Sequence, residues 1–269
     1  MTQKKCIFCQ GSGMSKEHFW PDWLRSYFKT TVSDKHIGEL HVSEGKAPLI
    51  LQRKKERSGN LITKKFRVVC KACNNGWMSQ LEEKVKPILI SILENKAISF
   101  DQKELSNLAR WAVMKVIVAE QSEDGTQVTP EMDRILFSKE GIIPDYFYVF
   151  IGKHKSGHDS AYLRHSTTLA LSKDGPAPRL NGMKRNTQTV SFLLGPLFVH
   201  VATCRVDNHR SVISFNMTPM TCIFPSHQGD ISWQSLDVIA QPRMSAIANA
   251  LLDITSGPMV KYAGPRPSD

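Results

Sequence analysis

The chain contains 269 residues, of which 41% are hydrophobic and 22% carry a charge. This length and composition suit one large or two modest folded domains and exclude a chain that is disordered throughout. No apolar run approaches the ~18 residues that a membrane-spanning helix needs, and no apolar segment follows the basic start "MTQKKCIFCQ", as a secretory signal would require. We therefore expect a cytoplasmic protein with no membrane partner.

The formal net charge of +10 is concentrated in the first hundred residues. They hold 18 Lys and Arg against 9 Asp and Glu, whereas residues 101–269 hold 17 against 16. Positive charge confined to one part of the chain favours a polyanionic partner there, because each Lys or Arg near a phosphate releases counterions. We expect DNA as this partner, with RNA also open, and the sequence leaves the oligomeric state unknown.

Two Cys-x-x-Cys pairs lie in this basic part: Cys6 and Cys9 in "CIFC", and Cys70 and Cys73 in "CKAC". A disulfide or a thioredoxin-like redox pair is one alternative, but neither pair lies between the strand and the helix of a βαβ unit. Two such turns together complete the tetrahedral four-sulfur shell that structural zinc prefers. The spacing therefore predicts a structural Zn²⁺ held by all four cysteines.

The stretch "KEHFWPDWLRSYF" follows the first cysteine pair. We expect a strand that ends at His18 and a short helix that begins at Pro21, because the first helical turn tolerates the missing proline N–H. A histidine among bulky apolar residues is usually a packed core residue, and that interpretation stays open for His18.

Residues 53–71, "RKKERSGNLITKKFRVVCK", contain eight basic residues and one acid. The turn signal "SGN" lies between two extended stretches, which predicts a basic β-hairpin. A solvated hairpin without a partner is the plain alternative, since charged runs commonly face water. The candidate nucleic-acid-binding residues are Arg53, Lys54, Lys55, Arg57, Lys64, Lys65 and Arg67.

After Cys73, apolar residues at helical spacing predict a helix, which Pro87 should kink or divide. Residues 101–121 predict an amphipathic helix with one apolar face, and residues 130–140 a shorter helix. Extended stretches follow, several with the alternation typical of antiparallel strands that have one covered face, and "MSAIANALLDI" predicts a last helix.

The order C-x-x-C, then "EHFWP", then C-x-x-C-N resembles the HNH endonuclease family over about residues 6 to 83. The resemblance implies a ββα-metal module that hydrolyses DNA phosphodiester bonds. It places His18 at the general-base position. Glu17, where the family usually has Asp, and Asn74 take the positions of ligands to a catalytic Mg²⁺ or Mn²⁺, and Asn75 offers a second amide beside them.

We therefore expect an α+β fold with an N-terminal zinc-stapled, HNH-like nuclease module over residues 1–98 and a C-terminal antiparallel sheet with helices over residues 99–269, whose role is unknown. Two other functions stay open. One is a non-catalytic zinc-stabilised nucleic-acid-binding protein, in which His18 merely packs. The other is a protein-interaction factor whose zinc is purely structural.

Overall fold

The computed structural model describes most of the chain. The described ranges are 4–28, 64–122, 125–155, 160–169, 184–206, 217–225 and 229–256, with side chains up to residue 251. Four further strands are described by their backbone alone: β2 (Lys35–Gly38), β3 (Val42–Glu44), β4 (Ala47–Leu49) and β5 (Lys55–Ser58). Residues 211–216 and the tail after residue 256 lie outside the described residues.

The main sheet has the strand order β12-β8-β11-β10-β9, with antiparallel neighbours. A short strand, β14 (Val238–Ile239), pairs in parallel with β8. A tight turn at Gly195-Pro196 joins β10 to β11, because Leu194 pairs with Leu197 and Gly195 has a φ of 56°. The four long strands are β8 (Phe147–His154), β9 (Ser160–Thr167), β10 (Thr187–Leu194) and β11 (Leu197–Cys204), and the edge strand β12 (Thr221–Phe224) is shorter.

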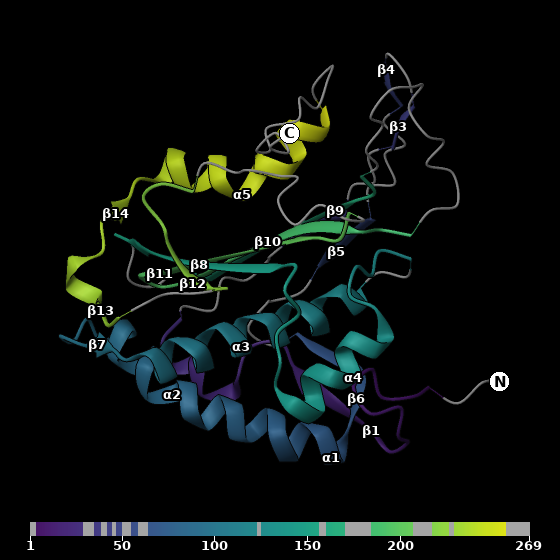
Figure 1. Ribbon diagram of the computed structural model, residues 1–269, viewed down its shortest axis with the longest axis horizontal. Helices are drawn as coiled ribbons and strands as arrows, with labels where there is room; N and C mark the ends of the chain where they lie inside the picture. The colour runs from purple at the N-terminus through teal and green to yellow at the C-terminus, as the bar shows by residue number, and fades with distance from the viewer. Residues whose placement is uncertain are drawn as a thin grey trace, which may run out of the picture.

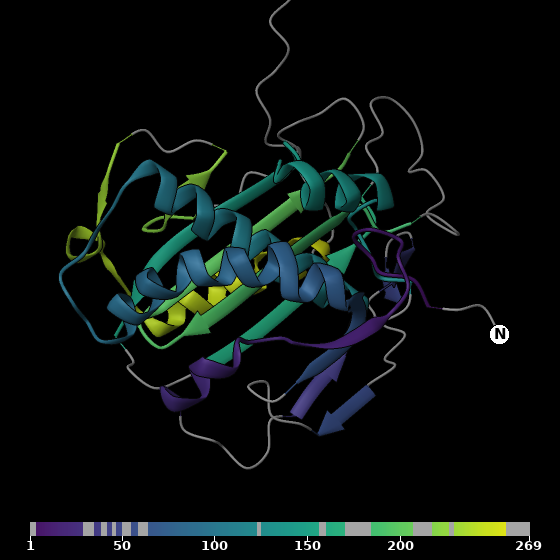
Figure 2. The same cartoon turned by 90° about the horizontal axis from the view of Figure 1, so that it is seen from below.

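Helices lie on both faces of this sheet (Figure 1). One face is covered by α5 (Gln241–Ser256), and the other by α3 (Gln102–Ala119), beyond which lies α2 (Ser79–Leu93). Seen from below, the helices cross the strands of the sheet (Figure 2). The mixed α+β class that the sequence predicted is confirmed.

The sequence suggested strands with one covered face, but β10 is buried along its whole length and β11 almost so. The reason is α5, which contacts β9 and β10 on the side that the alternation marked as polar. Leu193 belongs to an apolar cluster on that side together with Met244 and Ile247 of α5. The polar residues at the alternate positions are therefore buried under a helix and do not face water.

The helix α3 is the central element of the fold. It begins at a capping box in which Asp101 and Glu104 satisfy each other's backbone N–H groups. The sequence predicted one apolar face, but every residue from Trp111 to Ala119 is buried, because α3 is packed between the sheet and α2. Lys115 lies within this buried stretch and is fully inaccessible.

The N-terminal elements form a strand pair followed by a helix. As predicted, β1 (Met14–His18) ends at the histidine, and it pairs antiparallel with β6 (Lys65–Cys70). A 3-10 helix, η1 (Asp22–Ser26), begins directly after Pro21. After β6 the chain continues through α1 (Lys71–Cys73) and a π-helical turn, η3 (Asn74–Met78), into α2.

The expected division of this helix at Pro87 is not observed, because α2 continues through Pro87 to Leu93. The irregular turn comes earlier, at Gly76, whose φ of −95° and ψ of −114° are not helical. Glycine accepts this conformation without a Cβ clash.

The predicted basic hairpin over residues 53–71 is wrong in its pairing. The strand β5 pairs with β2, and β6 pairs with β1 instead of with β5. The strands β3 and β4 pair with each other, as do the two-residue strands β7 (Ser99–Phe100) and β13 (Ile231–Ser232). The turn signal "SGN" marked a strand end correctly but carried no information about the partner strand.

One buried apolar cluster spans the chain from Cys6 to Trp233 and crosses the expected boundary between residues 98 and 99. Residues from before and after this boundary meet where the Trp20 ring stacks on that of Trp111 at a centroid distance of 6.0 Å, and both side chains are fully buried. Division into two domains stays a prediction, and the described core is shared. No helix among the described residues is both long and apolar enough to cross a bilayer.

Candidate functional site

The four predicted zinc ligands come together. The Sγ atoms of Cys6, Cys9, Cys70 and Cys73 all lie within 4.8 Å of one another, and Cys9 and Cys70 are 3.5 Å apart. In a tetrahedral site with Zn–S bonds of about 2.3 Å, the sulfurs lie about 3.8 Å apart. All four are free thiols, so the cluster could bind a metal such as zinc.

The first cysteine turn is held by its own backbone and by β6. The N–H of Cys6 donates to the Gly11 carbonyl at 2.9 Å, and the N–H of Gln10 donates to the Cys6 carbonyl at 3.0 Å. Gln10 has a φ of 59°, which closes the turn. The N–H of Ile7 donates to the Val68 carbonyl at 3.0 Å, so the turn is attached to the strand that delivers Cys70.

The second cysteine pair lies at a helix start. Cys70 is the N-cap of α1, and its sulfur accepts the backbone N–H of Cys73 at 3.4 Å. Burial alone would raise the pKa of Cys70, but this N–H and the neighbouring thiols lower it to about 7. Burial raises the pKa of Cys9 and of Cys73 in the same cluster, so the suitability of the site for a metal rests on the convergence of four sulfurs, which bind metals as thiolates.

The cysteine cluster is also attached to the C-terminal half. The Phe8 ring lies 4.9 Å from the ring of Trp77 and 6.4 Å from that of Phe137 in α4 (Glu131–Glu140). From the same helix, Arg134 Nε donates to the Ile7 carbonyl at 3.1 Å and Ser138 Oγ to the Phe8 carbonyl at 3.2 Å. The first cysteine turn is thus docked on two elements besides its own.

His18 lies at the end of β1, directly opposite Lys65 on β6. Successive residues of a strand point to opposite faces, so His18 shares its face with Lys16 and Lys65, both of which are exposed. Its side chain is 28% exposed, and Nε2 lies 3.8 Å from Asp22 Oδ1. Partial burial, and next the charge of Lys65, lower the pKa of His18, which favours the neutral ring at neutral pH.

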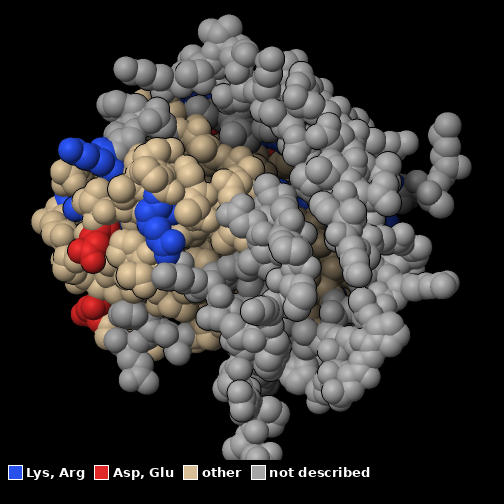
Figure 3. All heavy atoms as spheres, turned by 90° about the horizontal axis from the view of Figure 1, so that it is seen from above, with Lys and Arg blue, Asp and Glu red and all other residues tan. Residues whose placement is uncertain are grey.

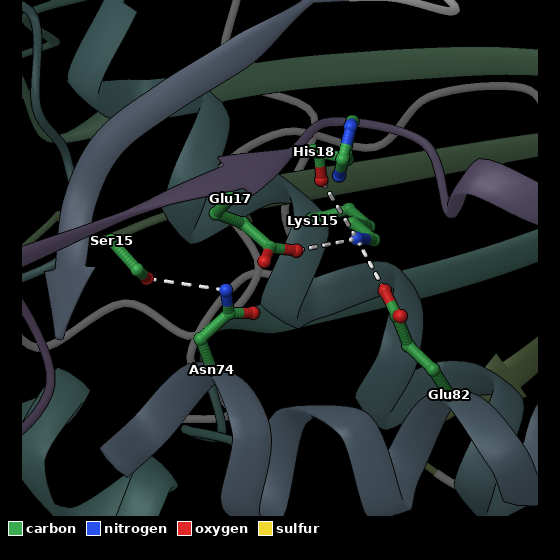
Figure 4. Close-up of polar contacts among 6 residues, drawn as sticks. All are labelled: Ser15, Glu17, His18, Asn74, Glu82 and Lys115. Carbon is green, nitrogen blue, oxygen red and sulfur yellow. Dashed lines mark hydrogen bonds and ion pairs between the residues drawn. The ribbon is translucent and has the colours of Figure 1, made fainter. Parts of the chain in front are cut away.

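Glu17 points to the opposite face of β1, toward the helices (Figure 4). Its side chain is 7% exposed, and Oε1 lies 3.3 Å from Nζ of Lys115. The same ammonium lies 2.6 Å from Glu82 Oε1 and 3.5 Å from the His18 carbonyl oxygen. Burial raises the pKa of Glu17, and the charge of Lys115 opposes that rise.

Asn74 lies on the same side as Glu17, and its Nδ2 donates to Ser15 Oγ at 3.1 Å (Figure 4). Asn75 is exposed. The structure therefore brings Glu17 and Asn74 together on the helix side of β1 and directs the His18 ring away from them.

Carboxylate and amide oxygens are the donors that Mg²⁺ and Mn²⁺ prefer. However, Glu17 Oε1 already contacts an ammonium, and the amide of Asn74 is oriented by Ser15. These contacts give no support to a divalent ion held by Glu17, Asn74 and Asn75.

The structure describes the side chains of only some of the candidate nucleic-acid-binding residues. Lys65 and Arg67 are exposed at alternate positions of β6, and Lys64 is half-buried with Nζ 5.1 Å from the centre of the Phe66 ring. Arg53 and Lys54 lie outside the described residues, and Lys55 and Arg57 belong to β5, of which the backbone alone is described. On the α5 side, the described surface carries separate charged side chains of both signs (Figure 3).

The sequence interpretation missed Lys115. The available signal was its position in "WAVMKVIVA", where one lysine interrupts a run of apolar residues. A lysine is almost never fully buried unless it is paired, so this position indicated a buried ion pair without naming its partners.

Comparison with known proteins identifies no relative: no protein family, curated protein or solved structure matches the chain.

Proposed function

We propose that this protein hydrolyses phosphodiester bonds of nucleic acid, with DNA as the expected substrate and His18 as the general base. The observation that carries the proposal is the position of His18. It ends β1 and lies opposite Lys65 of β6, the strand that leads through Cys70 and Cys73 into a helix. This order agrees with the HNH resemblance of residues 6 to 83 and supports an HNH-like module there.

Phosphodiester hydrolysis needs a general base that is neutral at the working pH and positive charge near the phosphate. Nε2 of His18 is buried and makes no hydrogen bond, with Asp22 Oδ1 3.8 Å away, so a proton held on Nε2 would leave Nδ1 to accept a proton from water. Lys65, across the strand pair, and the exposed Arg67 supply positive charge on the same strand. The cysteine centre, with its bound metal, would fix β6 and the helix start and take no part in hydrolysis.

A second candidate is a non-catalytic, zinc-stabilised nucleic-acid-binding protein. The contact of Glu17 with Lys115 favours it, because a nuclease that depends on Mg²⁺ or Mn²⁺ needs its ligands free to bind the ion. In this case Lys65 and Arg67 contact phosphates, and His18 only packs.

The experiment incubates supercoiled plasmid, single-stranded DNA and RNA with the protein, with Mg²⁺, with Mn²⁺ and with neither, and runs a gel-shift assay in parallel. The variant His18→Ala is compared with wild type and with His154→Ala, a matched control on β8. Removal of a general base should lower the cleavage rate about 10²- to 10⁴-fold.

Cleavage lost in His18→Ala but kept in His154→Ala, with binding unchanged, supports the hydrolase. Salt-dependent binding by all three proteins without cleavage supports the second candidate and rejects the first. No binding, or binding that salt leaves unchanged, rejects both and favours the protein-interaction factor with structural zinc.

A further inference from the structure

The ammonium of Lys115 is fully enclosed. Its side chain has no accessible surface, although lysine carries one of the most strongly hydrated charges in proteins. Burial of such a charge is tolerated only where partners replace the lost water. The position of Lys115 in the middle of α3, between the sheet and α2, therefore requires partners on one of those elements.

Lys115 has three oxygen neighbours, which equals the number of N–H donors of an ammonium. Glu82 of α2 is nearest at 2.6 Å, followed by Glu17 at 3.3 Å and the His18 carbonyl at 3.5 Å, both in β1 (Figure 4). One cation thus joins the end of β1 to α2, from a residue of α3. This oxygen-lined position between a strand and a helix is comparable to that of a bound metal ion.

The ammonium of Lys115 weakens the electrostatic attraction of this site for a divalent ion. Two carboxylates and one ammonium have a net charge of −1, and the more buried carboxylate, Glu17, already contacts the ammonium. A divalent ion on Glu17 would lie a few ångström from Lys115 in a poorly hydrated region, where like charges repel strongly. The burial of Glu17 also disfavours a divalent ion, because it limits the water molecules that Mg²⁺ usually keeps as ligands.

We infer that Lys115 is an internal cation that takes the place of a divalent ion between β1 and α2, so that Glu17 and Glu82 do not bind Mg²⁺ or Mn²⁺ in the folded protein. The inference concerns ion binding and holds whether or not the protein cleaves nucleic acid. It also identifies Glu17 as a structural partner of Lys115 and not as a ligand of a catalytic metal.

The test measures Mn²⁺ binding by electron paramagnetic resonance, with the zinc-loaded protein so that the cysteines are occupied. Lys115→Met removes the charged ammonium and leaves an unbranched side chain that is one heavy atom shorter. The variant leaves two neighbouring carboxylates uncompensated, so Mn²⁺ should bind to it at least about tenfold more tightly than to wild type. Mn²⁺ should also raise the melting temperature of the variant and leave that of wild type unchanged.

Two control proteins locate the effect. Lys103→Met removes an exposed lysine of the same helix, about 18 Å along its axis from Lys115, and should gain no Mn²⁺ binding. The double variant Glu17→Gln/Lys115→Met removes the more buried carboxylate and should lose most of the gained affinity. Equal Mn²⁺ affinity in Lys115→Met and wild type would overturn the inference.

A measurement that does not depend on the folding of Lys115→Met uses wild type and the nearly isosteric Glu17→Gln. If wild type binds one Mn²⁺ that Glu17→Gln loses, the ion and the ammonium share the site and the inference is wrong. If Glu17→Gln leaves Mn²⁺ binding unchanged, the inference is supported. Nuclease assays are not needed for either outcome, so a failed hydrolase proposal is recognised separately.

Discussion

Replacement of Cys9 by serine tests the metal centre most directly, because Cys9 is the exposed member of the four. The substitution removes one metal ligand without opening a cavity in the core. Wild type should contain about one zinc per chain, and Cys9→Ser should contain much less after dialysis against a weak chelator.

The expected loss of stability follows from the separation of the two cysteine pairs. Cys9 and Cys70 are 61 residues apart, so a metal that joins the pairs closes a long loop in the unfolded chain as well. The loop-closure relation for a cross-link of that length gives about 4 kcal/mol at room temperature. For a chain of this size, such a change corresponds to a fall of about 10 °C in melting temperature.

The assay combines metal analysis with urea unfolding followed by circular dichroism. Cys204→Ser is the matched control, since Cys204 is a free cysteine of β11 outside the metal cluster, and it should keep both its zinc and most of its stability. If Cys9→Ser retained a full zinc and the midpoint of wild type, the four sulfurs would not form a working metal centre.

Three further predictions concern charge. If His18 is the base, the cleavage rate should rise with pH through a midpoint below the ordinary histidine pKa of about 6.5 and be level at neutral pH. The reason is that burial and the charge of Lys65 lower the pKa of His18. A rate that still rises above about pH 7 would contradict this prediction. Lys65→Ala and Arg67→Ala should each weaken DNA binding and reduce the slope of log affinity against log salt concentration by about one, as measured by fluorescence anisotropy. An unchanged slope would mean that the substituted side chain does not contact a DNA phosphate. Burial, followed by the charge of His165, lowers the pKa of His200 to about 3, so its neutral form stabilises the fold fully above about pH 6.5 and this contribution is lost as the pH falls toward 3. At pH 4 the loss is about 3 kcal/mol, and His200→Gln should show a flatter dependence of unfolding free energy on pH; an equally steep dependence would exclude His200 as its source.

The elements with local causes could be predicted from the sequence. Paired cysteines at Cys-x-x-Cys spacing, a strand that stops at His18 and an apolar helix before residue 121 all depend on neighbouring residues, and each is present. The α+β class followed from the same local patterns.

The features that depend on contacts between distant segments could not be predicted. β6 pairs with β1 instead of β5 and also accepts a hydrogen bond from the first cysteine turn at Val68, and no turn signal encodes these contacts. Burial of the polar face of the sheet depends on α5, which comes last in the chain. The pairing of Lys115 with Glu17 and Glu82 joins residues 98 and 33 positions apart.

The stacked rings of Trp20 and Trp111 have a practical consequence for anyone who wishes to isolate the N-terminal segment. Ending the chain after residue 98 would leave Trp20 and Phe19 without the helix and strands that enclose them, and both are large apolar surfaces. Such a fragment would be prone to self-association. The cysteine-rich segment is therefore expected to need α3 and the main sheet to keep these rings covered.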